Sequence, residues 1–332
     1  NRMRRGHVGM EALSRACLKR LSGALWCFIV AVLPELLEAM EKNFRRYSRQ
    51  RVIWPDVVLL ALTCAVAAWF VVRAQEVLPR QWEWGRLLEY LVWHDAAGWH
   101  AGLLFKGVCT TLRLGVWAGI LAMLVGICVG AGSAGRRGWA ALPAQIFVTL
   151  LRNTPPLVLL FLIYLFASEQ LFGGLNETIR ALSPEAREMV AVLFADAGQI
   201  DRMAAAVLTL GVYEGAYVAE IVRAGLESVP RGQWDAGAAL GFPNGRRLRL
   251  IIFPQALPLM LPPLAGQCIS TFKESALAAL ISVPELTFQG MEVMSVTRRP
   301  FEAWLVVGLL YLLLSLGCAA VFRHVERSAV WR

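Results

Sequence analysis

The sequence predicts an all-α, polytopic membrane helical bundle with about six transmembrane helices. Hydrophobic residues make up 57% of the 332 residues, charged residues only 17%, and the mean hydropathy is +0.54. Soluble domains are nearer half apolar and a quarter charged. The apolar residues are gathered in runs close to the roughly 20 residues that one helix needs to cross a bilayer.

Six segments are expected to cross the membrane. They are residues 55–74, 111–130, 155–167 with a start nearer 144, 203–222, 255–282 and 301–322. In the fifth segment Pro258, Pro262 and Pro263 are expected to bend and break the helix. Such breaks are tolerated where neighbours or a water-filled cavity satisfy the freed carbonyls, which is consistent with a helix that lines a path. Gly126 and Gly130 in the second segment indicate close helix packing.

The positive charge predicts the orientation of the chain. Basic residues cluster directly before the first segment, at Lys42, Arg45, Arg46, Arg49 and Arg51. Such a cluster holds the N-terminal flank in the cytoplasm. Alternation then places residues 223–254 and the C-terminus in the cytoplasm, and residues 75–105, 170–202 and 283–300 outside. Since the net charge of +9 lies mainly between apolar runs, without a basic face bearing aromatic groups, no nucleic-acid partner is expected.

The first 50 residues fit this pattern less well. Leu21 to Leu33 is apolar for only 13 residues, which is short for a span. Met40 stands directly before the basic cluster, and our hypothesis is that the working protein begins near it. The predicted organisation is therefore an extension of uncertain status at 1–50, a first transmembrane helix and outer loop at 51–105, a core at 106–327 and a cytosolic tail at 328–332.

Residues 231–254, RGQWDAGAALGFPNGRRLRLIIFP, form an unusual polar connection between the fourth and fifth segments. We expect a short helix with Asp235 in its first turn, a left-handed end at Gly241 and a second helix from Pro243. The second helix is expected to turn three arginines to a polar side, at Arg246, Arg247 and Arg249. This connection, called the elbow below, is expected to lie on the cytosolic surface and fit a partner's groove.

Four stretches of this sequence carry a resemblance to a known family. WDAGAALG, followed by nine residues and IIFP, resembles the EAA signature of permease subunits of bacterial ABC importers, with Asp235, Gly237 and Phe253 in place of Glu, Ala and Leu. LLRNTPPLVLLFLIYLF (150–166), GAYVAEIVRAGLESVPRGQWDA (215–236) and FKESALAALISVPELT (272–287) resemble the permeases for polar amino acids. The resemblance covers roughly residues 107–327.

The resemblance implies a type I ABC importer permease in the bacterial inner membrane, with both termini cytoplasmic. Its implied partners are membrane lipid, a second permease copy or paralogue, a periplasmic amino-acid-binding protein and a dimer of cytosolic ATP-binding subunits. The partner ATPase would bind ATP-Mg, since this chain has no G-x-x-x-x-G-K-[ST] phosphate loop and is expected to hold no cofactor and to be no enzyme. The implied ATPase-coupling residues are Trp234, Asp235, Ala236, Gly237, Gly241, Phe242, Ile251 and Pro254. Gly237 is expected to loosen the first helix by up to about 1 kcal/mol relative to Ala.

Ionisable residues inside the expected spans suggest a substrate path. Glu214 and Lys273 lie within the fourth and fifth segments, where charges are costly unless they are paired or face an aqueous cavity. An acid and a base lining one cavity would suit the ammonium and carboxylate of an amino acid. Tyr217, Glu274 and Ser275 are further candidates for this path. The alternative is structural: Lys273 snorkels or pairs with Glu274, and Glu214 pairs within the bundle.

A secondary transporter and an intramembrane enzyme are the two alternative classes of protein. A secondary amino-acid transporter could use Glu214 and Lys273, but it should show repeat-related halves with matching broken segments. An intramembrane enzyme would need a nucleophile with a paired base, and no histidine lies within an expected span.

The seven cysteines include no CxxC pair, so neither a metal site nor a disulfide framework is indicated. Glu220 and Arg223 are expected to anchor the elbow by charge pairing.

Overall fold

The computed structural model describes residues 58–59, 61–66, 68–69, 73, 89–95, 98–134, 139, 141–196 and 198–330. The chain has two compact units, Asn1–Gln81 and Trp82–Arg332. The described residues of the first unit are helical and exposed. The expected extension at 1–50 and the hypothetical start at Met40 lie outside the described residues, and the first expected span, 55–74, is described only in part.

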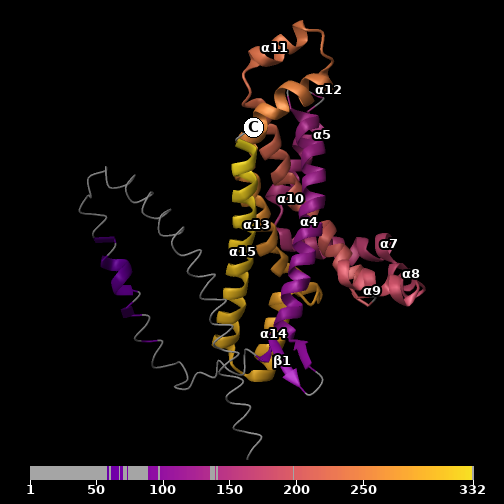
Figure 1. Cartoon of the computed structure of the whole chain (residues 1–332), viewed down its shortest axis with the longest axis vertical. Helices are drawn as coiled ribbons and strands as arrows, with labels where there is room; N and C mark the ends of the chain where they lie inside the picture. The colour runs from indigo at the N-terminus through magenta and orange to yellow at the C-terminus, as the bar shows by residue number, and fades with distance from the viewer. Residues whose placement is uncertain are drawn as a thin grey trace, which may run out of the picture. The chain divides into compact units, whose positions relative to one another are not determined.

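The second unit is built almost wholly of helices (Figure 1). Its first elements are the strands β1 (Val92–Asp95) and β2 (Gly98–Ala101), then α4 (Leu103–Ser133), α5 (Leu142–Asn153), α6 (Pro156–Leu162) and the π-helical η2 (Ile163–Ala167). There follow α7 (Ser168–Phe172), α8 (Leu175–Arg180), α9 (Pro184–Leu193), α10 (Ile200–Glu227), α11 (Arg231–Ala239) and α12 (Asn244–Arg247). The last are η3 (Leu248–Ile252), α13 (Phe253–Glu274), η4 (Ser275–Ile281), α14 (Leu286–Thr297) and α15 (Pro300–Val330).

The described helices confirm an all-α membrane bundle. Four are long and apolar enough to cross a membrane: Leu103–Ser133, Ile200–Glu227, Asn244–Ile281 and Pro300–His324. A bent pair, Leu142–Asn153 with Pro156–Phe166, brings the number within the described residues to five. The two-stranded antiparallel hairpin of β1 and β2, in the expected outer loop, is a small addition that the sequence did not predict.

The third expected span, at 155–167 with a start nearer 144, corresponds to the bent pair of helices. The axes of its two halves meet at 104°. The residue before a proline is disfavoured in the helical region, because the proline ring crowds its backbone. Thr154 precedes Pro155, which itself precedes Pro156, and both Thr154 and Pro155 are extended, with ψ of 129° and 132°. Two consecutive extended residues therefore end α5 and redirect the chain into α6.

The fifth span was expected to break at its three prolines, and this prediction was wrong. α13 continues through Pro258, Pro262 and Pro263. α13 packs against α10 and α15 through its buried side, and the three prolines lie on its exposed side. The irregular turns lie at its two ends instead, in the π-helical η3 before it and the 3₁₀-helical η4 after it.

The pairing of α4 with α10 forms the centre of the bundle. Small residues bring the two backbones together, as expected from Gly126 and Gly130. A Cβ atom on Gly130 would lie 2.5 Å from the carbonyl oxygen of Ala219, and one on Gly126 would collide with Val218. α13 packs on α10, and α14 and α15 pack on each other. The helices α10 and α13, which the elbow joins, thus lie side by side.

Candidate functional site

The elbow begins with α11, one turn earlier than the sequence suggested. Pro230 is the N-cap of α11, and the helix starts at Arg231. Asp235 therefore lies in the second turn, and the expectation that it occupies the first turn was wrong. Pro230 favours this early start because its fixed φ of −54° suits the residue that leads into a helix. The Asp235 side chain is exposed.

The end of α11 confirms the predicted role of Gly241. Gly241 has a φ of +77°, in the left-handed region that glycine enters without a steric penalty. The Phe242 N–H donates to the Gly237 carbonyl at 3.1 Å, and the Gly241 N–H donates to the Ala238 carbonyl at 2.9 Å. This pair of bonds is a Schellman motif, which satisfies the last carbonyls of the helix. It sets the angle at which the chain turns into α12.

Arg247 does not lie on the polar outer side with the other elbow arginines, as was expected. Its guanidinium lies 5.7 Å from the centre of the Trp234 ring and donates to the Trp234 carbonyl at 3.2 Å and to the Asn244 Oδ1 at 2.6 Å. Gly237 is buried beneath it, where an added Cβ would lie 2.9 Å from both Arg247 Cγ and Ile251 Cδ1. The missing side chain at position 237 therefore makes room for the second arm of the elbow.

The predicted coupling residues divide into an outer and an inner set. The exposed set is Asp235, Ala236, Gly241 and Pro254. The half-buried or buried set is Trp234, Gly237, Phe242 and Ile251. Leu240, at the end of α11, is 74% exposed, although it is a large apolar side chain. The elbow thus offers a small, partly apolar surface, while the bulky coupling residues Trp234, Phe242 and Ile251 are half-buried.

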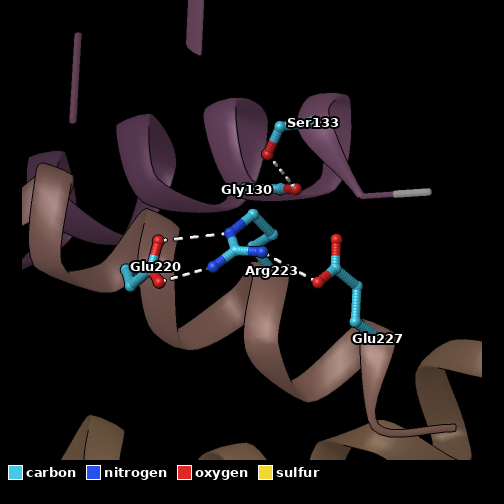
Figure 2. Close-up of polar contacts among 5 residues, drawn as sticks. All are labelled: Gly130, Ser133, Glu220, Arg223 and Glu227. Carbon is cyan, nitrogen blue, oxygen red and sulfur yellow. Dashed lines mark hydrogen bonds and ion pairs between the residues drawn. The ribbon is translucent and has the colours of Figure 1, made fainter. Parts of the chain in front are cut away.

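The inner end of α10 carries the expected pairing of Glu220 with Arg223 (Figure 2). Arg223 donates to both carboxylate oxygens of Glu220, at 2.6 and 3.2 Å, and to Glu227 at 2.8 Å. The nearby Ser133 hydroxyl donates to the Gly130 carbonyl at the end of α4. All three charged residues belong to α10, so these pairs stiffen the helix end that leads into the elbow and do not themselves reach the elbow.

A polar cavity of about 540 Å³ lies between α5 and α10, near this helix end. Its lining comprises Ser133, Ala144, Gln145, Val148, Thr149, Arg152, Asn153, Tyr217, Ala219, Glu220 and Arg223. The Arg152 guanidinium lies 5.1 Å from the centre of the Tyr217 ring. Tyr217 also shares a hydrogen bond with the Tyr213 hydroxyl at 3.1 Å. Of the predicted path residues, only Tyr217 lines this cavity.

Glu214 and Glu274 come together at the interface of α10 and α13. Glu214 is fully buried, and the Gln267 side-chain amide donates to its Oε2. The Glu274 carboxyl lies within hydrogen-bonding reach of Glu214. Glu214 Oε1 and Glu274 Oε2 are buried and have no hydrogen-bond partner among the described residues. Buried carboxyl oxygens without a partner are costly, so these two are candidates to receive a cationic group.

Two predicted path residues lie elsewhere. Lys273 is exposed, whereas Glu214 is fully buried, and that the two side chains line one cavity stays a prediction. Successive helix residues point about 100° apart, which turns Lys273 away when Glu274 faces α10. The buried Ser275 hydroxyl donates to the Phe272 carbonyl of its own helix at 2.7 Å. Neither side chain joins the acidic pair.

Two polar residues of this region were not singled out from the sequence. Gln267 lies seven residues before Glu274, a spacing that places both on one helix face and could have identified it. Arg152 lies in the last turn of α5, within the LLRNTPP stretch of the resemblance. Its contact with Tyr217 joins residues 65 apart in sequence, and no local pattern signals it.

Glu285, within the PEL run, is a buried junction between helices. Its side chain accepts from the backbone N–H groups of Thr287 and Phe288 at 2.9 and 2.8 Å and from the Tyr311 hydroxyl at 2.6 Å. The Thr111 hydroxyl of α4 accepts from the Leu286 N–H at 3.1 Å. Burial raises the pKa of the Glu285 carboxyl, and the hydrogen bonds it accepts oppose that rise.

Comparison with known proteins places the chain among transport proteins. The chain is 34% identical to the glutamine transport system permease protein GlnP of Escherichia coli (strain K12) over 229 residues, which cover 68% of this chain and 92% of that protein. It is 29% identical to the histidine/lysine/arginine/ornithine transport system permease protein HisQ of Escherichia coli (strain K12) over 227 residues, covering 68% and 93%.

A solved structure and a family model agree with these relatives. A crystal structure of an amino acid ABC transporter with histidines matches with a TM-score of 0.53 and 29% identity, covering 68% of this chain and 94% of that chain. The fold is thus that of a type I ABC importer permease. The model of the binding-protein-dependent transport system inner membrane component matches residues 108–330. With two thirds of its length matched by that model, the chain belongs to the family of inner membrane components of binding-protein-dependent transport systems.

Proposed function

We propose that this chain is the permease subunit of an ATP-driven importer for polar L-amino acids, and that its elbow docks on a cytosolic ATPase. The observation that carries the proposal is the elbow itself: an exposed short helix, ended by a Schellman motif at Gly241, that joins two neighbouring helices of the bundle. The relatives named for glutamine and for histidine, lysine, arginine and ornithine support the substrate class.

The proposed assembly contains two permease subunits, two cytosolic ATPase subunits and a periplasmic amino-acid-binding protein. ATP-Mg is bound and hydrolysed by the ATPase subunits, and both termini of the permease face the cytoplasm. The elbow leaves α10 after Glu227 and enters α13 at Phe253. Because Glu214 lies on α10 and Gln267 and Glu274 lie on α13, a movement of the elbow changes the spacing of these side chains.

The proposed substrate path runs along this interface. Glu214 and Glu274 supply buried carboxyl oxygens that have no partner among the described residues, and these can receive the ammonium group of an amino acid. Tyr217 and Arg152 then line the polar cavity nearer the elbow. A secondary transporter built on Glu214 and Lys273 is not favoured, since the chain belongs to a family of binding-protein-dependent systems.

The test is co-purification of the detergent-solubilised permease with the ATPase encoded beside it. We expect the wild-type chain to retain the ATPase, and Asp235→Lys and Gly241→Pro to lose it while still inserting into the membrane. Glu177→Lys, an equal charge reversal at an exposed site on α8, serves as the matched control and should retain it. If no ATPase binds the wild type, or the elbow variants bind it as well as the control does, the coupling role is refuted.

A further inference from the structure

The elbow consists of two arms that pack against each other. The first arm is α11, and the second is α12 with η3. Arg247 of the second arm makes the polar part of this contact, since its guanidinium lies over the Trp234 ring and donates to the Trp234 carbonyl at 3.2 Å. The same guanidinium donates to Asn244 Oδ1 at the start of α12. The Arg247 side chain thus contacts both Trp234 in the first arm and Asn244 at the start of the second arm.

The neighbouring arginines do not share this arrangement. Arg246 and Arg249 are exposed, whereas Arg247 is half-buried and its Nε is enclosed without a hydrogen-bond partner among the described residues. An arginine fork stacked on an aromatic ring gains cation–π attraction in addition to its hydrogen bonds. Enclosing a guanidinium costs free energy unless such contacts offset the loss of water. The position of Arg247 therefore depends on its contacts with Trp234 and Asn244.

Gly237 of α11 lies directly against the Arg247 side chain. An added Cβ would lie 2.9 Å from Arg247 Cγ, 3.0 Å from Arg247 Cδ and 2.9 Å from Ile251 Cδ1. The glycine that departs from the EAA signature thus sits where the Arg247 stem crosses α11. Glycine at position 237 lowers the helix propensity of α11 relative to alanine, but it lets the two arms approach each other more closely. Residues 237 and 247 form a complementary pair, because the missing side chain of one makes room for the stem of the other.

We propose that Arg247 is a positioning residue that locks α11 to α12 and η3, so that the elbow transmits movement of the ATPase to α10 and α13 as one body. This inference rests on the proposed function, since it requires that the elbow contact an ATPase. It goes beyond docking because Arg247 acts inside the elbow. Its loss should leave docking intact and reduce the transmission of movement.

The test uses the whole importer, reconstituted in proteoliposomes with its ATPase and loaded binding protein. The readout is the number of amino-acid molecules taken up per ATP hydrolysed. For Arg247→Ala we expect this ratio to fall by about fivefold or more, the lower end of usual coupling between two sites, with the ATPase still bound. Arg246→Ala removes the same charge from an exposed site and should keep the wild-type ratio. Arg247→Lys, which lacks the planar fork, should give an intermediate ratio.

A second measurement separates a lock between residues from a general loss of stability. Gly237→Ala should lower the thermal midpoint of the assembled importer. In the Arg247→Ala background, where the stem that the new methyl group meets is gone, the drop caused by Gly237→Ala should be smaller by about 2 °C or more. Equal effects of Gly237→Ala in both backgrounds would refute the complementary pair.

The outcomes distinguish this inference from the proposed function. A wild-type ratio for Arg247→Ala, or loss of the bound ATPase in that variant alone, overturns the lock while the elbow remains a docking element. Failure of the wild-type permease to bind any ATPase overturns both. A reduced ratio with the ATPase bound, together with unequal effects of Gly237→Ala, supports the lock.

Discussion

At the scale of single residues, Glu285 joins three helices through one carboxyl group. It caps the first turn of α14 and accepts a hydrogen bond from Tyr311 on α15, and the adjoining Leu286 N–H donates to Thr111 on α4. The carboxyl group is fully buried. A buried junction of this kind is stable only while each of its polar groups keeps a partner.

We therefore predict that Glu285→Ala destabilises the permease by about 2–3 kcal/mol, because the variant leaves two backbone N–H groups and the Tyr311 hydroxyl without their acceptor. Thermal unfolding of the purified protein in detergent measures the loss. Tyr311→Phe removes the hydroxyl's bonds to Glu285 and Thr287 but keeps both backbone caps, and should cost less, about 1–2 kcal/mol. Equal unfolding midpoints for Glu285→Ala and the wild type would contradict the assigned junction.

At the scale of helices, the contact of α4 with α10 depends on the absence of side chains at a few positions. Gly130 lies against the Ala219 carbonyl and Val222, whereas a Cβ on Gly119 of the same helix would meet no atom within 4 Å. Both glycines carry the same helix-propensity cost. They differ only in what lies opposite them.

Gly130→Ala is accordingly expected to destabilise the bundle, because the new methyl group forces α4 and α10 apart; overpacking of this kind typically costs about 1–3 kcal/mol. Gly119→Ala should be neutral or stabilising by up to about 1 kcal/mol, since alanine is the better helix former. The two unfolding midpoints, measured side by side, check the prediction. A midpoint for Gly130→Ala at or above that of Gly119→Ala would show that the helices do not approach each other here.

At the scale of the whole molecule, the elbow and the acidic pair belong to one connected pair of helices. α10 carries Glu214, its inner end is stiffened by Arg223, and the elbow then leads into α13 with Gln267 and Glu274. Under the proposed function, movement applied at the elbow would reach the buried carboxyl groups through α10 and α13 without a separate relay.

For the reconstituted importer we predict that Glu214→Gln and Glu274→Gln lower amino-acid uptake by about tenfold, the effect of losing roughly 1.4 kcal/mol of charge attraction for the substrate ammonium. Binding of the ATPase should be unchanged in both. Thr209→Val, a substitution of similar size at another buried polar residue of α10, is the control and should transport as the wild type does. Unchanged uptake in both Gln variants would remove the acidic pair from the path.

Local chemistry explains which parts of the elbow and bundle could be predicted. The left-handed end of α11 followed from Gly241, and the close helix packing followed from Gly126 and Gly130, because each depends on one residue's own backbone or size. The helix through Pro258 could not be predicted, since the side of α13 that packs against α10 and α15, and hence the exposed side on which Pro258 lies, is set by tertiary contacts. Arg247 was misplaced because its partner Trp234 lies 13 residues away.

The sequence by itself determined the membrane-spanning helices, the position of the elbow and the permease signature, since apolar length and glycine and proline positions act within a few residues. Only the tertiary structure decided that Glu214 meets Glu274 while Lys273 is exposed, and that Arg247 packs inward over Gly237. Those outcomes depend on which faces of two helices, far apart in the chain, come into contact. Helix periodicity shows which residues share a face, but it cannot show what that face will meet.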